Sequence, residues 1–370
     1  MQKDFERHAA EISAGLAEDR KQAEMRSKGN CETQALFRPL IDFEEEEATW
    51  LVPGWIPQGQ ITLVAADGGA GKTSLWVDIA SAISSGHPCI LDPPGHTREL
   101  GTVLFCTTED SVKKKLRRKL REAGADLTRV QAMDLTADKD GLLRSFKFGT
   151  AELYEVIRSI KPDLCVFDPV QGFIPPDVNM GSRNAMRDCM APLITIGEDV
   201  GTTFIVICHT NKRKGAYGRD RIADSADLWD ISRSVIMLGY TDEQGQRYIS
   251  NEKNNYDQLQ DSVLFTINDN GQAKRTGTTW KRDRDYQLEA ASSKTISNVE
   301  DCSTYIIQAL SEAEGPVEVK QLDSMAQSAG YSGQTIKRAK SKLKSESEIK
   351  YINKGSGRDG SKQWFAELTY

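Results

Sequence analysis

The sequence predicts an α/β protein with a mainly parallel sheet, followed by a small domain of three helices and a hairpin. Apolar runs of strand length alternate with helical patterns between residues 48 and 240, which is typical of parallel strands covered by helices on both faces. Beyond residue 299, three helical patterns precede two short β-like runs. These two observations define the expected fold class.

The predicted strands of the sheet are short and strongly apolar. They cover residues 61–66, 102–108, 129–135, 164–169, 202–210 and 234–239. Two further β-like runs, at 248–254 and 262–268, extend the sheet through antiparallel hairpins. The helical patterns between the strands cover residues 72–85, 110–123, 150–160 and 183–200.

Composition divides the chain into four parts. Residues 1–45 form a helical and linker segment, 46–283 contain the sheet, 284–298 are a linker rich in polar and small residues, and 299–370 form the small domain. A polar helix is expected over residues 2–28, with a thin apolar stripe at Phe5, Ala9, Ile12 and Leu16. That stripe fits either a frayed tail or a helix that docks on a neighbouring subunit.

The bulk properties favour a cytoplasmic protein. The chain is 38% hydrophobic, yet its apolar runs stay below the ~20 residues that a membrane span needs. The seven cysteines include no C-x-x-C pair, which argues for a reducing compartment and against a zinc site or a disulfide framework. A formal charge of −6 does not by itself indicate nucleic-acid binding, so local patches decide that question.

The segment after the first strand of the sheet has the chemistry of a phosphate-binding loop. It reads Ala66-Asp-Gly-Gly-Ala-Gly-Lys72-Thr73 and opens the helical pattern at 72–85. Backbone N–H groups at a helix N-terminus attract phosphate, and glycines let the backbone approach it. Ala66 replaces the first glycine of the usual pattern, which is tolerated if its φ is negative.

This loop predicts a site for ATP and Mg²⁺. The alternative is a glycine-rich turn that binds no ligand. We expect Lys72 to reach the β- and γ-phosphates and the Thr73 hydroxyl to bind Mg²⁺. The residues expected to bind the nucleotide are Asp67, Gly68, Gly69, Ala70, Gly71, Lys72, Thr73 and Ser74.

Polar residues at the ends of three other strands complete the predicted site. Asp168 is the expected second Mg²⁺ ligand. The alternative is that it is an aspartate of an ordinary turn at the end of the strand. Glu109 follows a strand that we expect next to the P-loop strand, and it is the expected base for water. Asp110 is expected to cap the next helix. His209 is expected to sense the γ-phosphate. The alternative is a histidine at a strand end whose hydrogen bonds are made within the fold.

Four segments together resemble one family. They are Trp50-Leu-Val-Pro-Gly-Trp-Ile-Pro-Gln-Gly59, Glu109-Asp110, Asp168-Pro169 and His209-Thr-Asn-Lys212. Over residues 42–270 the chain resembles the RecA-like ATPases of the RepA type, which occur in plasmids, phages and integrated elements. The resemblance implies a RecA-like P-loop NTPase core, assembly into a ring or filament, and ATP sites shared between subunits.

The resemblance also carries roles to individual positions. Lys72 and Thr73 match the phosphate and magnesium ligands, Glu109 the catalytic glutamate and His209 the sensor. Arg233 and Lys253 both match positions that reach a neighbour's γ-phosphate, and the sequence leaves open which of them does so. Arg233 could instead pair with an aspartate, and Lys253 could be an exposed strand lysine.

DNA contacts are expected in two places. In RecA-like rings the loops after the Asp168 and His209 strands bind DNA, and these are residues 171–187 and 212–225. The second loop carries Lys212, Arg213, Lys214, Arg219 and Arg221 among glycines. A mobile loop with this charge could bind a phosphate backbone. A merely solvated loop is the alternative.

The small C-terminal domain gives the second indication, because its elements follow the order of a winged helix-turn-helix. Helices are expected at 299–313, 319–329 and 332–345, and strands at 349–352 and 363–368. The third helix has five basic residues and no acid over 332–344, as in a recognition helix. Ile336, Ala339 and Leu343 should face the core, whereas Gln334, Thr335, Lys337, Arg338 and Lys342 should face DNA; wing contacts are expected from Lys354, Arg358 and Lys362. A protein-docking module is the alternative.

The leading hypothesis is an ATP-driven DNA motor, a hexameric ring helicase that acts in replication of a mobile element. It would bind single strands through the core loops and duplex DNA through the winged helix. The alternative is an ATP-dependent switch, loader or recombination factor that assembles on DNA without unwinding it. A small-molecule kinase would leave the basic third helix without a role.

Overall fold

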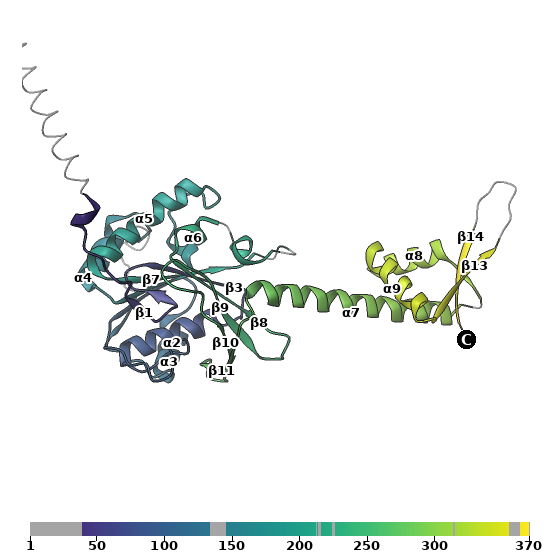
Figure 1. The fold of residues 1–370 in the computed structure, drawn as a ribbon, viewed down its shortest axis with the longest axis horizontal. Coiled ribbons are helices and arrows are strands. Elements are labelled where there is room, and N and C mark those ends of the chain that lie inside the picture. The colour runs from purple at the N-terminus through teal and green to yellow at the C-terminus, as the bar shows by residue number, and fades with distance from the viewer. Residues whose placement is uncertain are drawn as a thin grey trace, which may run out of the picture. The chain divides into compact units, whose positions relative to one another are not determined.

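A nine-stranded sheet forms the centre of the chain (Figure 1). Its strands are β3 (Ile61–Ala66), β4 (Val103–Thr107), β5 (Val130–Ala132), β6 (Leu164–Asp168), β7 (Thr203–His209), β8 (Ser234–Tyr240), β9 (Arg247–Asn254), β10 (Ser262–Ile267) and β11 (Ala273–Thr279). This computed structural model describes residues 39–133, 146–211, 213, 216–223, 226–313, 315–354 and 363–369. The N-terminal helix expected over residues 2–28 lies outside that range.

The order of the strands confirms the predicted fold class. It runs β11-β10-β9-β8-β3-β7-β6-β4-β5. From β8 to β5 all neighbours are parallel, and β9, β10 and β11 continue the sheet through antiparallel pairs. The β11 strand was not predicted, because its segment Ala-Lys-Arg-Thr-Gly-Thr-Thr is polar.

The position expected for the strand before Glu109 is wrong. We expected β4 next to the P-loop strand β3, but β7 and β6 lie between them. Local apolar patterns identify strands, whereas long crossover connections decide which strands become neighbours. The consequence for the site is small, because the carboxyl ends of all parallel strands meet at one edge of the sheet.

Helices cover both faces of the sheet, as predicted. α2 (Lys72–Ser85) and α3 (Arg117–Glu122) pack into one apolar core, which includes Val64 and Trp76. α4 (Ala151–Ile160), α5 (Arg183–Val200) and α6 (Ala226–Ile231) pack against the other face, whose core includes Leu63. Adjacent residues of β3 thus pack into the cores on opposite faces of the sheet, because successive side chains of a strand point to opposite faces.

The helix predicted over 110–123 begins differently from our expectation. Its first turn is a π-helix, η2 (Val112–Leu116), which continues into α3. The N-cap is Ser111, whose hydroxyl accepts a hydrogen bond from the Lys114 N–H at 3.2 Å. Asp110 pairs instead with the Lys115 ammonium at 2.7 Å, so the capping role predicted for Asp110 is wrong.

Shorter elements also occur. The 3₁₀ turns η4 (Val170–Phe173) and η5 (Gly218–Arg221) follow strands of the sheet, and the antiparallel pair β1 (Trp50–Val52) and β2 (Ile56–Pro57) precedes β3. A further 3₁₀ turn, η1 (Leu40–Asp42), belongs to the separate N-terminal unit. Among the described residues, no helix has the length and apolar character to cross a membrane.

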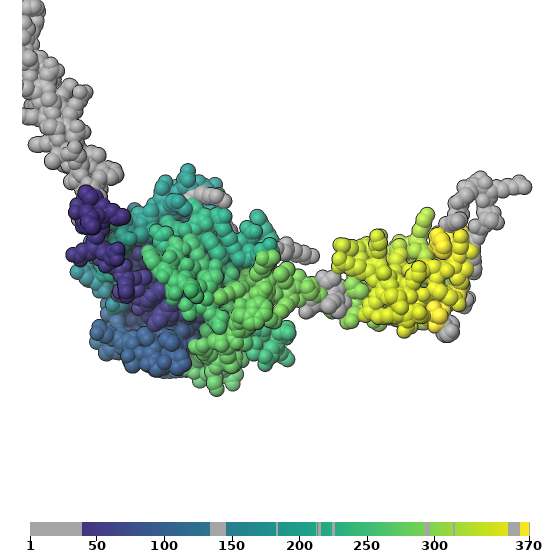
Figure 2. Space-filling model, in the orientation of Figure 1, coloured from purple at the N-terminus to yellow at the C-terminus, as the bar shows by residue number. Residues whose placement is uncertain are grey.

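The C-terminal part has its own apolar core. In Figure 2 this part is a rounded body, coloured yellow. Its elements are α7 (Asp283–Ser311), β12 (Val317–Glu318), α8 (Val319–Ser328), α9 (Gly333–Ser345), β13 (Ile349–Lys354) and β14 (Gln363–Leu368). The three strands pair antiparallel in the order β12-β14-β13. Ile336, Ala339 and Leu343 of α9 are buried in this core, as predicted.

The segment predicted as a linker, 284–298, belongs to α7. Small and polar residues suggested a flexible connection, yet α7 contains neither glycine nor proline over its whole length. Alanine, glutamate and lysine favour a helix, and the helix-breaking residues are absent from this segment. Composition alone therefore misjudged its local structure.

One close backbone contact fixes α5 against the strands. Gly197 of α5 lies so near the turn before β3 that an added Cβ would sit 2.3 Å from the Gly59 carbonyl oxygen. Gly59 is itself held by a hydrogen bond from its N–H to the Thr203 hydroxyl at 3.0 Å. The helix and the turn can therefore approach only because position 197 has no side chain.

We predict that Gly197→Ala destabilises the protein by about 1–3 kcal/mol, because overpacking forces the backbone apart. Gly277→Ala is the control, since its Cβ would meet only the Leu264 side chain, at 3.9 Å; it should change stability by less than about 0.5 kcal/mol. Urea unfolding measures both. Equal midpoints for the two variants would contradict the contact.

Candidate nucleotide site

The loop between β3 and α2 forms an open cradle of backbone N–H groups. Gly69 and Gly71 adopt left-handed conformations, with φ of 77° and 107°. Gly71 is the N-cap of α2 and provides no side-chain acceptor for the first turn, so that turn can donate to an anion. A Cβ on Gly71 would also come within 3.0 Å of Ile267. Ala66 ends β3 in strand conformation, so glycine is not needed there.

The predicted polar residues meet around this cradle. A cavity of about 430 Å³ is lined by Gly68, Gly69, Gly71, Lys72, Thr73 and Ser74 of the loop. Glu109, Asp168 and His209 line the same cavity from three other strands. Cations, backbone donors, a hydroxyl and two carboxylates thus converge, which is the donor set that a magnesium nucleotide requires.

Lys72 links two strand ends. Its ammonium donates to the carbonyl oxygens of Ala66 at 2.7 Å and Asp67 at 3.2 Å, and lies 3.2 Å from His209 Nδ1. Since an ammonium can only donate, Nδ1 is the acceptor when this contact is a hydrogen bond. Burial lowers the pKa of Lys72, and the nearby Asp168 carboxylate opposes that shift.

Asp168 is oriented from α2. The indole Nε1–H of the buried Trp76 donates to Asp168 Oδ2 at 2.9 Å. Asp168 pairs in register with Thr107 of β4, so Glu109 follows two residues beyond that pair. The Thr107 hydroxyl accepts from the N–H of Glu109 at 3.4 Å and of Asp110 at 3.3 Å. These contacts bring both carboxylates to one edge of the sheet.

Other residues that line the cavity were missed from the sequence. They include three cations, Lys115, Lys119 and Arg247, and the hairpin residues Ile267 and Gly271. The basic run that follows Glu109 could have indicated the two lysines. No comparable signal identified Arg247, which reaches the site only because β9 pairs with β8.

Two residues of the predicted loop set do not line the cavity. Ala70 is fully buried. The Asp67 carboxylate accepts from the Thr210 hydroxyl and from the Arg221 guanidinium, the latter at 3.2 Å. Asp67 therefore connects the loop to residues beyond β7.

The two candidates for a trans-acting cation lie at the opposite edge of the sheet. The Arg233 N–H bonds to the carbonyl of Ile61, the first residue of β3. Since β3 has six residues at ~3.3 Å each, Arg233 cannot serve the P-loop of its own chain.

Lys253, the other candidate, contacts backbone carbonyls of its own chain. Its ammonium donates to the carbonyl oxygens of Trp229, Asp230 and Ser232, at 3.0, 3.1 and 2.7 Å. These carbonyls lie at the C-terminal end of α6, where a cation is favoured. Burial lowers the pKa of Lys253. Within its own chain, Lys253 thus caps a helix, and its predicted role toward a neighbour stays a prediction.

The expected DNA contacts in the loop after β7 also change. Arg221 is 3% exposed and pairs with Asp67 and Asp283, so its assignment as a DNA contact is wrong. Arg219 pairs with Asp230 and is partly exposed. Arg213 is exposed, whereas Lys212 and Lys214 lie outside the described residues.

The basic helix α9 presents some of its predicted contact residues to solvent. Gln334, Lys337 and Arg338 are exposed. Thr335 is half-buried, and Lys342 is half-buried and lies 3.4 Å from Glu300. The wing residues Arg358 and Lys362, and the side chain of Lys354, lie outside the described part of the chain.

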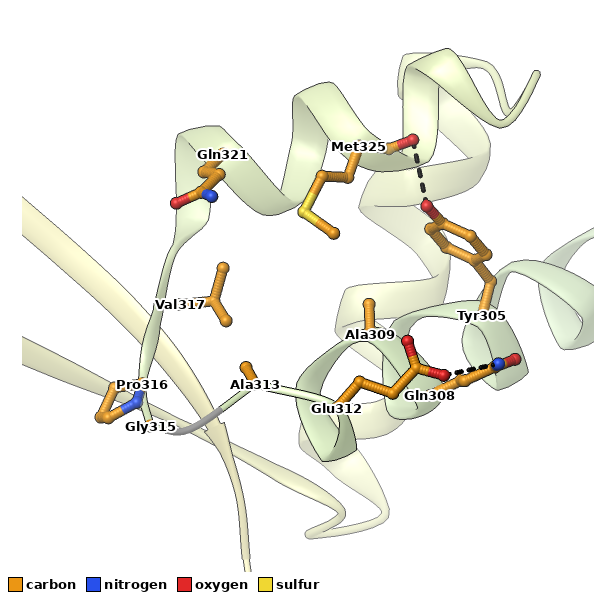
Figure 3. Close-up of a pocket in the computed structure, with 10 residues that line it drawn as sticks. All are labelled: Tyr305, Gln308, Ala309, Glu312, Ala313, Gly315, Pro316, Val317, Gln321 and Met325. Atoms are coloured by element: carbon orange, nitrogen blue, oxygen red, sulfur yellow. Dashed lines mark hydrogen bonds between the residues drawn. The ribbon is translucent and has the colours of Figure 1, made fainter.

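A second cavity, of about 520 Å³, lies between α7 and α8 (Figure 3). Tyr305, Met325 and Val317 line it, and its carboxylate, Glu312, accepts from the Gln308 amide at 2.9 Å. No lysine or arginine is among its described lining residues. This chemistry does not suit a phosphate.

The half-buried Asp168 carboxylate should affect the pH dependence of stability. Burial raises its pKa, with the Trp76 hydrogen bond opposing, so ionisation at neutral pH opposes folding and stability increases as pH falls toward the folded-state pKa. We predict that Asp168→Asn, which keeps an oxygen for Trp76, raises the Tm of the nucleotide-free protein at pH 7 by a few degrees. The same change should flatten the dependence of Tm on pH. A lower Tm for the variant would contradict this account.

Comparison with known proteins identifies distant relatives. The DNA repair protein RadA of Listeria monocytogenes is 22% identical over 260 residues, which are 69% of this chain and 49% of RadA. RadA of Chlamydia trachomatis is 21% identical over 305 residues, covering 79% and 60% of the two chains. The chain thus spans about half the length of the curated relatives that it matches.

A solved structure and a family profile complete the comparison. A KaiC-like protein of Pyrococcus horikoshii aligns with 16% identity and a TM-score of 0.44, over 63% of this chain and 99% of its own. The profile of the AAA domain family matches residues 30–215. These residues include the P-loop, Glu109, Asp168 and His209. The chain therefore belongs to the AAA domain family, with a RecA-like P-loop ATPase core.

Proposed function

We propose that this protein is an ATP-driven DNA motor, which assembles as a hexameric ring helicase of the RepA type and acts in replication of a mobile element. The observation that carries the proposal is the P-loop cavity, where Lys72, Thr73, Glu109, Asp168 and His209 converge. The RadA relatives are named for DNA repair, which supports DNA as the partner.

The geometry supports in-line hydrolysis of ATP. Lys72 and the loop N–H groups bind the phosphates, and Thr73 and Asp168 would hold Mg²⁺, which neutralises phosphate charge when bound. Glu109 orients a water molecule toward the γ-phosphorus and accepts its proton as the bond to the ADP oxygen breaks. His209, beside Lys72, reports the loss of the γ-phosphate to the loop that follows β7.

Arg233 completes the site from a neighbouring subunit in this proposal. Its position at the amino edge of the sheet excludes its own P-loop, and Lys253 is engaged by α6. Such arginines stabilise charge in the transition state and contribute about 10³–10⁵ in rate.

The C-terminal part binds duplex DNA as a winged helix in this proposal. Three helices and an antiparallel sheet surround one core, and α9 presents Lys337 and Arg338 to solvent. The Ser332 hydroxyl caps α9 by accepting from the Thr335 N–H at 3.2 Å. This exposed basic helix also favours the second candidate function, a DNA-bound switch or loader that hydrolyses ATP without unwinding.

We predict that Glu109→Gln lowers kcat by about 10²–10⁴, the usual contribution of a general base, while ATP still binds. The assembled, ATP-bound state should then accumulate and be visible by light scattering. Glu99→Gln is the control, since Glu99 is exposed and does not line the cavity. Wild-type hydrolysis by the Glu109 variant would place the base elsewhere.

A mixing experiment tests the shared site. Arg233→Ala and Lys72→Ala should each be inactive alone, because one lacks the trans cation and the other the phosphate ligand. Mixed together they should recover part of the wild-type rate, since Arg233 of the Lys72 variant completes the P-loop of the Arg233 variant. Arg129→Ala, which removes a surface ion pair with Asp126, should retain activity. Full activity of Arg233→Ala alone would contradict the role.

A further inference from the structure

Arg221 is an unusual arginine, because it is buried between two carboxylates from distant parts of the chain. Its side chain is 4% exposed. One guanidinium nitrogen lies 3.2 Å from Asp67 Oδ2 in the P-loop, and the other donates to Asp283 Oδ1 at the start of α7. A buried charge is stable only when it is paired, which explains why these three residues stay together.

The same cluster fastens the loop after β7 to α7. Asp283 is fully buried, and its carboxylate also accepts from the Tyr248 hydroxyl at 2.7 Å and the Gly218 N–H at 3.4 Å. Gly218 and Arg221 bound the η5 turn of this loop. One buried cluster therefore joins the P-loop, the loop after β7 and the first turn of α7.

The exposed side of the loop carries a stacking surface. Tyr217 is 41% exposed, and the Arg284 guanidinium of α7 lies 4.8 Å from the centre of its ring. An aromatic ring beside a guanidinium binds nucleic-acid bases without regard to sequence. Arg213, also exposed, supplies positive charge in the same loop.

Asp67 connects this surface to the catalytic lysine. Its carboxylate contacts Arg221, and its carbonyl oxygen accepts from the Lys72 ammonium at 3.2 Å. Asp67 is therefore the one residue that contacts both Arg221 and Lys72 in this chain of described contacts. In the chain, Arg221 lies three positions after Gly218 and four after Tyr217.

We propose that Arg221 is a positioning residue of the ATP site, which couples it to single-stranded DNA bound on Tyr217. Binding of a base at Tyr217 changes the contact between Arg221 and Asp67 and so the P-loop. Nucleotide binding, in turn, changes the affinity for DNA by the same factor, since coupling of two binding equilibria is reciprocal. This inference rests on the proposed function only for the identity of the ligand.

The test breaks the contact from the P-loop side, because removal of Arg221 would leave buried carboxylates unpaired. Asp67→Asn keeps an oxygen for the Thr210 hydroxyl and leaves the pair of Arg221 and Asp283 intact. Arg158→Gln is the control; it removes a surface ion pair between α4 and α5. Binding of a fluorescent oligothymidylate is measured with and without a non-hydrolysable ATP analogue.

We expect the analogue to change wild-type DNA affinity by about 5-fold or more, a usual size for such coupling. The ratio should fall to near one in Asp67→Asn and stay at the wild-type value in Arg158→Gln. The ratio, rather than either affinity alone, is the readout, because a merely structural defect weakens both states alike. An unchanged ratio in Asp67→Asn would overturn the coupling.

Amide hydrogen exchange separates this inference from the DNA proposal. The analogue should slow exchange in residues 217–222 and 283–290 of the wild-type protein, without DNA, and that protection should disappear in Asp67→Asn. If this occurs while the oligonucleotide does not bind, the link stands and the DNA proposal fails. If wild-type exchange in these segments ignores the analogue, the link itself is wrong.

Discussion

The nucleotide site depends on the parallel pairing of β3 with β7. This pairing places the end of the P-loop strand beside His209, in register with Ala66. Lys72 can then bridge the two strand ends through backbone carbonyls and an imidazole nitrogen. Without that register, the first turn of α2 would still form an anion cradle, but the histidine would lie too far away to respond to the γ-phosphate.

The strands on either side of β3 and β7 also place residues by their position in the sheet. β6 delivers Asp168 one strand beyond β7, and β4 delivers Glu109 one strand further. On the other side, β8 begins just after Arg233, whose N–H bonds to the carbonyl of Ile61, so Arg233 lies at the opposite edge of the sheet from the P-loop. In the proposed assembly, this separation is what lets Arg233 complete a neighbour's site.

Much of this could be predicted from the sequence, because the relevant signals are local. The P-loop has a fixed spacing, and α2 runs over residues 72–85 as its apolar pattern indicates. Asp168, Glu109 and His209 could be chosen because each follows an apolar strand. The burial of Ile336, Ala339 and Leu343 followed from helical spacing in the same way.

The failures at the site involve contacts between distant segments. Arg221 looked like a DNA-contacting cation, yet it is buried and paired with Asp67 and Asp283, and the Lys253 ammonium donates to carbonyls at the end of α6. A charge count cannot distinguish a solvated arginine from a buried one, because the partners lie far along the chain. The strand order and the cavity residue Arg247 were missed for the same reason.

The central claim is that ATP hydrolysis at this site drives movement on DNA. The most direct test is the steady-state ATPase rate without DNA, with single-stranded DNA and with duplex DNA, at about 0.1 M salt because phosphate contacts are salt-sensitive. The Lys72→Ala variant sets the background. Strong stimulation by single strands is the result that we predict for a translocating ring. A rate that ignores single strands would contradict the motor and favour the DNA-bound switch.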